Sequence, residues 1–153
     1  MVISKPALKA ALLERLEQDL AAARAAHQAA VDGATHSEAR AENDKDTRGL
    51  EQSYLARGHA QRVVELETAV AAIAAWQPRG FGDEPVTLGA LVTVEEDHQS
   101  RRFLIAGHGG GVVLPGEVTV LTPTSPIGRM LLGRAVEDDC EIGKRILTIT
   151  AVE

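Results

Sequence analysis

Two alanine- and leucine-rich segments in the first half of the chain carry apolar residues at alternating spacings of three and four. In the first segment these positions are Leu13, Leu16, Leu20, Ala23, His27 and Ala30. In the second segment they are Leu66, Ala69, Ile73 and Trp76, with Val63 and Val70 widening the stripe. This spacing places the side chains along one face of an α-helix. Because neither helix can bury that face alone, the pattern predicts an antiparallel helical hairpin with coiled-coil packing.

Residues that start and stop helices mark the ends of the two predicted helices. Pro6 suits the first turn of a helix, because its missing N–H needs no partner there. Residues 31–36 have the character of a helix end, and Asp46 or Thr47 is a good N-cap for the second helix. The polar stretch 37–46 then forms the tip of the hairpin. Helices of about 25–30 residues would each be roughly 40 Å long.

The composition changes near Trp76, which predicts a second domain. Five of the six prolines and most of the glycines follow this residue, together with short runs rich in Val, Ile, Leu and Thr. The runs predict strands at 91–94, 102–106, 118–121 and 146–150, the first two separated by a turn at 95–100. We therefore expect an α+β fold, with a hairpin domain at 1–77, a linker at 78–85 and a small, mostly antiparallel β domain at 86–153.

A short helix is predicted between the third and fourth strands of this β domain. Ser125 stands at the N-cap, Pro126 at the first helical position, and Gly133 just after the last turn. Each residue type is preferred at that position, because the serine hydroxyl satisfies a free backbone N–H and glycine tolerates a positive φ.

The bulk properties limit the partners and the compartment. The net charge of −6 argues against a protein that holds nucleic acid by neutralising phosphates. A single cysteine, Cys140, precludes an intramolecular disulfide and is expected to be a small hydrophobic residue of the β domain. The N-terminal sequence has no uninterrupted apolar stretch of the kind found in signal peptides or membrane spans. We expect a cytoplasmic monomer that does not contact a membrane.

Three motifs in the second half occur in a recognisable order. They are residues 89–94, 103–107 and 124–134, and the last contains the pattern Ser-Pro-apolar-small-Arg-x-apolar-apolar-Gly. This order resembles the C-terminal domain of the Gre family of bacterial transcript-cleavage factors. Residues 137–142 and 61–67 extend the resemblance, which therefore spans nearly the whole chain.

The Gre resemblance implies a fold and a partner. It implies a fold of the FK506-binding-protein type from about residue 86 onward and docking of that domain at the rim of the secondary channel of bacterial RNA polymerase. The hairpin would then enter the channel and stimulate the polymerase's own cleavage of the nascent RNA 3′ end in backtracked complexes. The chain would contact RNA only within that complex and would not itself be an enzyme. The implied polymerase-binding residues are Ser125, Pro126, Ile127, Gly128, Arg129, Leu132 and Arg134.

The hairpin tip departs from the family pattern. In the cleavage factors, an Asp and a Glu three residues later help to hold a second Mg²⁺ at the polymerase active site. Counting back without gaps from Arg62 puts Glu42 at the Asp position and Lys45 at the Glu position. A shifted alignment leaves Ala39 at the Asp position. Neither alignment reproduces both acids.

Three acids nevertheless cluster at the tip, namely Glu42, Asp44 and Asp46. Carboxylates of this kind could place a Mg²⁺ shared with the polymerase, and no cofactor of the chain's own is implied. Lys45 lies within the cluster and would repel a cation. The alternatives are a regulator or inhibitor that occupies the channel without cleavage, and a solvated tip in which Asp44 or Asp46 only caps the second helix.

Two further function classes fit only a part of the sequence. The implied fold class includes peptidyl-prolyl isomerases, whose apolar pocket is lined largely by aromatic rings. From residue 86 onward the only aromatic residue is Phe103, so such a pocket cannot be assembled. A coiled-coil assembly module would fit the hairpin alone, but it would leave the match in the second half unexplained.

Overall fold

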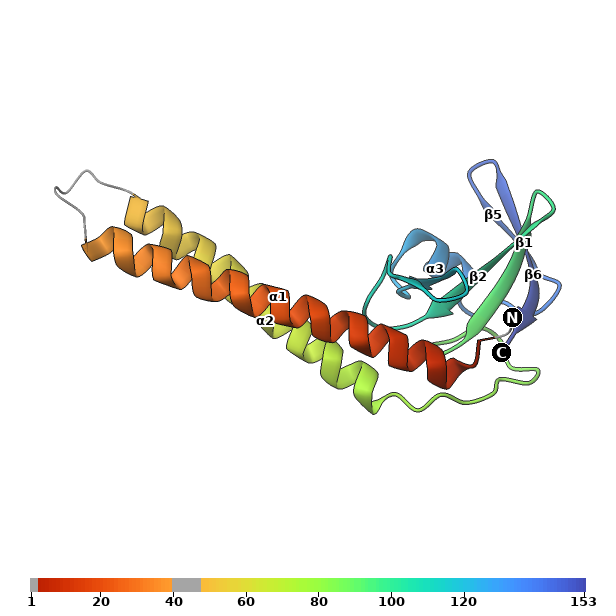
Figure 1. Ribbon diagram of the computed structural model, residues 1–153. Coiled ribbons are helices and arrows are strands. Elements are labelled where there is room, and N and C mark those ends of the chain that lie inside the picture. Colours follow the sequence, from red (N-terminus) through yellow and green to blue (C-terminus); the bar gives the residue numbers. More distant parts are fainter. Residues whose placement is uncertain (1–2, 40–47) are drawn as a thin grey trace. The chain divides into compact units, whose positions relative to one another are not determined.

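The computed structural model describes residues 3–39 and 48–153 (Figure 1). Its elements in chain order begin with two long helices, α1 (Lys5–Ala39) and α2 (Arg48–Ala75). The strands of one sheet follow, with one short helix between the fourth and fifth of them. The folded chain divides into two compact units, one of Met1–Leu13 with Ala72–Glu153 and one of Glu14–Ala71. The domain boundaries expected at residues 77 and 86 stay a prediction.

Helices α1 and α2 pack antiparallel within the second unit, as their apolar stripes predict. Three cross-helix contacts give the direction, because the α2 partner falls in number as the α1 residue rises. Arg24 lies 3.7 Å from Glu67, the Nδ1 atom of His27 lies 3.1 Å from the Ala56 carbonyl oxygen, and Gly33 approaches Gln52. The buried stripe positions of this unit are Leu16, Leu20, Ala23, Ala30, Ala34, Leu66 and Ala69.

The stripe of α1 follows a slightly different line near the N-terminus from the one predicted. Leu13 is only half-buried, whereas Leu8 and Leu12 are fully buried. The reason is a second packing partner. The side chain of Leu12 lies so close to Gly109 that a Cβ there would be 2.7 Å from the Leu12 Cδ1 atom. Helix α1 therefore turns its first apolar residues toward this loop of its own unit.

The helix end predicted at residues 31–36 is wrong, because α1 continues to Ala39. Glycine in a helix interior costs about 1 kcal/mol relative to alanine. At Gly33 a Cβ would lie 3.1 Å from the Gln52 Oε1 atom, so glycine lets the helices approach closely. The expected tip at 37–46 thus begins inside α1. Residues 40–47, with the proposed N-caps Asp46 and Thr47, lie outside the described residues.

The sheet confirms the predicted α+β class. Its order is β3-β4-β2-β1-β6-β5, and every neighbouring pair is antiparallel except β2 with β4. The strands are β1 (Leu91–Glu96), β2 (Gln99–Ile105), β3 (Val113–Leu114), β4 (Val118–Leu121), β5 (Asp139–Ile142) and β6 (Arg145–Val152). All four predicted strands are present.

The sequence did not predict strands β3 and β5, and the turn between β1 and β2 is shorter than predicted. Strand β3 has only two residues, and β5 alternates exposed acids with inward side chains, a composition of low β-propensity. The turn expected at 95–100 shrinks to Asp97 and His98, which have φ values of 51° and 66°. Two consecutive positive φ values suit a tight hairpin whose twist matches that of the strands. Strands β1 and β2 are longer for this reason.

One apolar core holds the β domain together. It contains Val92, Val94, Phe103, Ile105, Leu147 and Ile149 from the sheet, with Leu131 from the short helix and Phe81 from the preceding segment. Phe103 is 1% exposed and is part of this core. Cys140 is 1% exposed, which confirms it as a small core residue, and burial raises the pKa of its thiol.

The C-terminal end of α2 is capped by a side chain from α1. The Nζ atom of Lys9 donates to the carbonyl oxygens of Ala74 at 3.0 Å and Trp76 at 2.6 Å. A cation at this end suits both the free carbonyl groups and the helix dipole, and α2 has no basic residue in its own last turn. Among the residues described, no helix is long and apolar enough to cross a membrane.

The first prediction concerns the helical hairpin. Leu66→Ala should lower the free energy of unfolding by about 2–5 kcal/mol, because it removes a fully packed side chain from the seam. Val64→Ala is the matched control, since Val64 lies on the same helix with 59% of its surface exposed and should change stability by about 0.5 kcal/mol or less. Urea unfolding followed by circular dichroism measures both. Equal effects of the two variants would contradict the buried seam.

Candidate functional site

Helix α3 (Pro126–Leu131) lies at the centre of the predicted docking segment. The Ser125 hydroxyl accepts a hydrogen bond from the Gly128 N–H at 3.1 Å and donates one to the Thr122 carbonyl oxygen at 2.8 Å. Pro126 occupies the first helical position, and Gly133 follows the helix with a φ of +79°. The predicted start and stop signals of this short helix are confirmed.

The structure leaves no room for a side chain at Gly128. A Cβ at this residue would lie 2.0 Å from the Thr122 carbonyl oxygen and 2.7 Å from the Ser125 hydroxyl. Both distances are shorter than the contacts that Cβ atoms make in proteins, and the nearest atom belongs to the backbone. Gly128 therefore allows the turn before α3 to close, and it is itself buried.

The end of α3 is fixed to the chain that enters the β domain. The Val86 N–H donates to the Arg134 carbonyl oxygen, and the Gly133 N–H donates to the Val86 carbonyl oxygen, each at 2.8 Å. Val86 is 1% exposed and belongs to the core, against which Ile127 and Leu132 also pack. These contacts hold the α3 segment in one orientation on the β domain.

The seven residues expected to bind polymerase therefore divide into two groups. Ser125, Ile127, Gly128 and Leu132 are buried or half-buried and shape the segment. Pro126, Arg129 and Arg134 have exposed side chains. The structure brings these three to one segment, which presents two positive charges and an apolar ring to solvent. Their contact with polymerase stays a prediction.

The acids expected at the hairpin tip are not placed by the structure. Glu42, Asp44 and Asp46, together with Lys45, lie outside the described residues. Their roles in holding a shared Mg²⁺ and assisting cleavage therefore stay predictions. In residues 3–35 and 50–153, whose side chains are described, no group of three or more His, Cys, Asp or Glu side chains could hold a metal ion.

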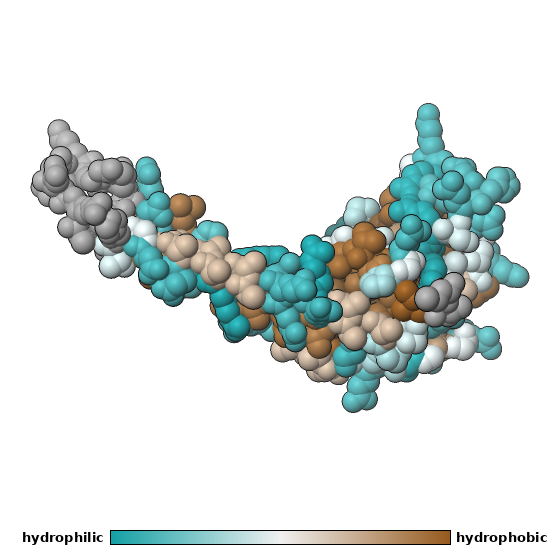
Figure 2. Space-filling model, in the orientation of Figure 1, coloured by the Kyte–Doolittle hydropathy of each residue, from teal (hydrophilic) through white to brown (hydrophobic). Residues whose placement is uncertain are grey.

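Sequence reasoning missed exposed apolar residues near the start of α2. Leu50, Tyr54 and Leu55 have 54%, 58% and 53% of their surface exposed. The Arg57 guanidinium carbon lies 5.5 Å from the centre of the Tyr54 ring. Figure 2 shows hydrophobic residues interspersed with hydrophilic ones along the two helices. The signal in the sequence was the single tyrosine of the chain, which lies off the apolar stripe.

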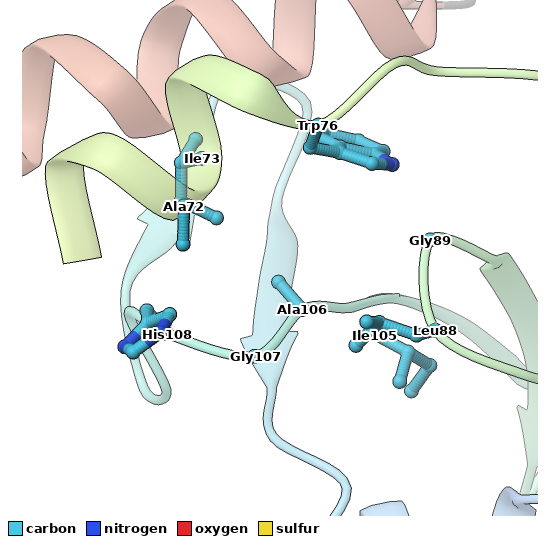
Figure 3. A pocket seen from close by; sticks show the side chains of 9 residues that line it. All are labelled: Ala72, Ile73, Trp76, Leu88, Gly89, Ile105, Ala106, Gly107 and His108. Atoms are coloured by element: carbon cyan, nitrogen blue, oxygen red, sulfur yellow. The ribbon is translucent and has the colours of Figure 1, made fainter. Parts of the chain in front are cut away.

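An apolar cavity of about 170 Å³ lies where the end of α2 meets the β domain (Figure 3). Trp76 and Ile73 border it on one side, and Leu88 and the segment from Ile105 to His108 border it on the other. Gly89 has a φ of +91° and packs against the indole ring of Trp76. Small-molecule sites usually have volumes of about 300–1,000 Å³, so this cavity is small for a separate ligand.

The strongest ion pair of the described residues has a structural role. The guanidinium of Arg145 on β6 donates to both carboxylate oxygens of Glu96 on β1, at 2.6 and 2.9 Å. Arg101 on β2 adds a longer contact of 3.4 Å. The hydrogen bond from Arg145 holds the pKa of the Glu96 carboxyl below its usual value. The cluster joins three neighbouring strands and contains none of the predicted site residues.

These features define a class of protein, namely a long antiparallel helical hairpin followed by a small, mostly antiparallel β domain with one short, serine-capped helix. No family model matches the chain. The chain is 29% identical over 150 residues to transcription elongation factor GreA of Sphingopyxis alaskensis, which covers 92% of this chain and 90% of that protein.

Solved structures with some similarity include GreA factor homolog 1 (Gfh1) of Thermus thermophilus and Gfh1 of Thermus aquaticus. The first is 22% identical with a TM-score of 0.41, and covers 92% of this chain and 94% of its own. The second is 21% identical with a TM-score of 0.40, and covers 92% of both chains. The match to GreA confirms the resemblance to the Gre family that the sequence motifs indicate.

The second prediction concerns the turn before α3. Gly128→Ala should lower the free energy of unfolding by about 1–3 kcal/mol, because the added methyl group forces backbone atoms apart. Gly80→Ala is the control, since no atom lies within 4 Å of a Cβ there and its φ is not positive. That variant should leave stability unchanged or raise it slightly. Thermal unfolding of both variants checks the expectation, and an unaltered Gly128→Ala protein would show that the turn is not held as described.

Proposed function

We propose that this chain is a transcription elongation factor that binds bacterial RNA polymerase at its secondary channel and acts there as a monomer. It stimulates the polymerase's own cleavage of the nascent RNA 3′ end in backtracked complexes. The observation that carries the proposal is the match to a GreA protein over 92% of the chain, on a fold that combines a helical hairpin with a small β domain.

The length of the helices supports this proposal. Helix α1 has 35 residues and α2 has 28. At 1.5 Å per residue they are about 50 and 40 Å long. A polymerase active site is enclosed, so a narrow helical pair can approach it where a globular surface cannot. The buried seam of leucine and alanine gives the pair its stiffness.

The proposed chemistry takes place in the polymerase. Hydrolysis of a phosphodiester by two metal ions requires carboxylates that place the second cation and an oriented water molecule. Glu42, Asp44 and Asp46 would supply carboxylates to a Mg²⁺ shared with the polymerase. The chain would then be a cofactor for cleavage, and it would meet RNA only at the 3′ end inside the complex.

The exposed residues of the α3 segment are the proposed anchor. Arg129 and Arg134 place two cations beside Pro126 on a rigid segment. Guanidinium groups bind carboxylates through two parallel hydrogen bonds, so an acidic patch on the polymerase suits them. The net charge of −6 disfavours nucleic acid as the docking partner.

A second candidate function is supported by one residue. Lys45 stands at the position where an ungapped alignment expects the second acid of the family. Its ammonium group would repel a divalent cation among the neighbouring carboxylates. With that repulsion dominant, the chain would occupy the channel as a regulator or inhibitor without stimulating cleavage.

The third prediction distinguishes these functions in a stalled transcription complex. Adding the protein to purified bacterial polymerase halted in a backtracked state should shorten the RNA from its 3′ end. The triple variant Glu42→Ala, Asp44→Ala, Asp46→Ala should bind polymerase with unchanged affinity and lose the shortening. Lys45→Glu should increase it, because a further carboxylate replaces a repelling cation. Gel analysis of labelled RNA measures all of these outcomes.

The anchor is tested in the same assay. Arg129→Glu with Arg134→Glu should weaken polymerase binding by at least tenfold, whereas Lys144→Glu, on the exposed β5–β6 turn, should not. Binding without any shortening by the unaltered protein would favour the second function. The absence of polymerase binding would overturn both.

A further inference from the structure

Lys5 has an unusual environment for a surface lysine. It is the first residue of α1, and its Nζ atom donates to the Arg79 carbonyl oxygen at 2.8 Å. The same atom lies 4.2 Å from the centre of the Phe81 ring. The guanidinium of Arg79 lies 4.3 Å from that ring centre, so one buried ring has two cations against it.

The amine of Lys5 lies beside open space rather than inside the core. A cavity of about 330 Å³ is bordered by Lys5, Arg79, Leu91 and Glu153, among others. This volume is enough for a small organic anion to approach the amine. Among the described residues, the charged groups that act on Lys5 are Arg79 and Glu153, and Arg79 is itself paired with Glu84 at 2.7 Å.

These surroundings make the amine less basic. Partial burial and the charge of Arg79 lower the pKa of Lys5 to about 8, although Glu153 acts in the opposite direction. Contacts of the Lys5 ammonium with the Phe81 face and the Arg79 carbonyl favour the charged form and oppose these two effects. At pH 7.5 about a quarter of the amine is then neutral, compared with about one part in a thousand for a lysine with its usual pKa of 10.5.

We propose that Lys5 is a site of Nζ-acylation by small acyl phosphates, of which acetyl phosphate is the simplest. The neutral Nζ atom attacks the acyl carbonyl carbon and forms the amide C–N bond. The bond from that carbon to the phosphate oxygen breaks, phosphate leaves with the electron pair, and the amine proton passes to water. Arg79 beside the cavity favours an anionic donor over a neutral one.

The folded chain tolerates the product of this reaction. The amide is uncharged, so its partial burial no longer costs solvation energy, and the repulsion by Arg79 disappears. The amide N–H can still donate to the Arg79 carbonyl oxygen, whereas the attraction between the ammonium and the Phe81 ring is lost. Acylation therefore changes the charge at the start of α1 and leaves the core around Phe81 in place.

The fourth prediction is a rate measured on the intact protein. After incubation with acetyl phosphate at pH 7.5, peptide mass spectrometry should show Lys5 acetylated about tenfold faster than Lys144, which is exposed in the β5–β6 turn. The neutral fraction alone gives a larger ratio, and the lower intrinsic nucleophilicity of a less basic amine reduces it, as it does for thiols. Fragment ions separate Lys5 from the N-terminal amine.

The dependence on pH identifies the cause. The rate at Lys5 should level off above pH 8, where most of the amine is already neutral, whereas the rate at Lys144 should continue to rise toward pH 10. Arg79→Gln should slow the reaction at Lys5 and Glu153→Gln should accelerate it, with Lys144 unchanged in both. A rate at Lys5 no higher than that at Lys144, or parallel pH profiles, would overturn the proposal. So would a lack of response to both variants. None of these outcomes depends on polymerase binding.

Discussion

Each of the two long helices has a single apolar stripe, and in the second unit the stripes are buried against each other. Leu16 and Leu20 of α1 and Leu66 of α2 form the larger contacts of this seam. Closer to the tip the seam consists of small residues, and Gly33 brings the helices close enough for contact with Gln52. A helical pair held in this way can be long and narrow without a large core. The composition agrees, since only 3% of the residues are aromatic.

The β domain shows how one sequence motif serves two purposes. Ser125 and Gly128 are needed for the turn and the start of α3, through a hydrogen bond of 3.1 Å and a space too small for a Cβ. Arg129 and Arg134 are exposed on the same segment. Several residues of the motif by which the chain resembles the Gre factors are therefore needed to form a local structure. The proposed docking role falls on the residues that the local structure leaves free.

Much of this fold could be predicted from the sequence, because local patterns determine it. The stripe spacing predicted the hairpin, and the Ser-Pro and Gly signals predicted α3. The misses have physical causes that local patterns do not contain. The sequence around Gly33 predicts a helix end, yet α1 continues through this residue, where α2 comes close enough for Gln52 to approach the glycine. Strand β5 is paired with β6 along its whole length. Its two acidic residues have low β-propensity, so the sequence alone does not predict this strand.

The candidate site was less predictable than the fold. The resemblance named the α3 residues, but only the structure separates the exposed Arg129 from the buried Gly128. The environment of Lys5 depends on Arg79 and Glu153, which are far from it in sequence, so no local pattern could reveal it. The roles proposed for the tip acids depend on a partner that would supply the other metal ligands. The proposed chemistry would be a property of the complex and not of this chain alone.

The central claim is that this chain occupies the secondary channel of bacterial RNA polymerase, and competition for that site tests it most directly. The binding of labelled protein to core polymerase can be measured by fluorescence anisotropy while unlabelled GreA is added. The account predicts saturable binding that GreA displaces completely, as expected for two proteins that share one channel. Binding that persists at saturating GreA, or no binding to polymerase, would contradict it.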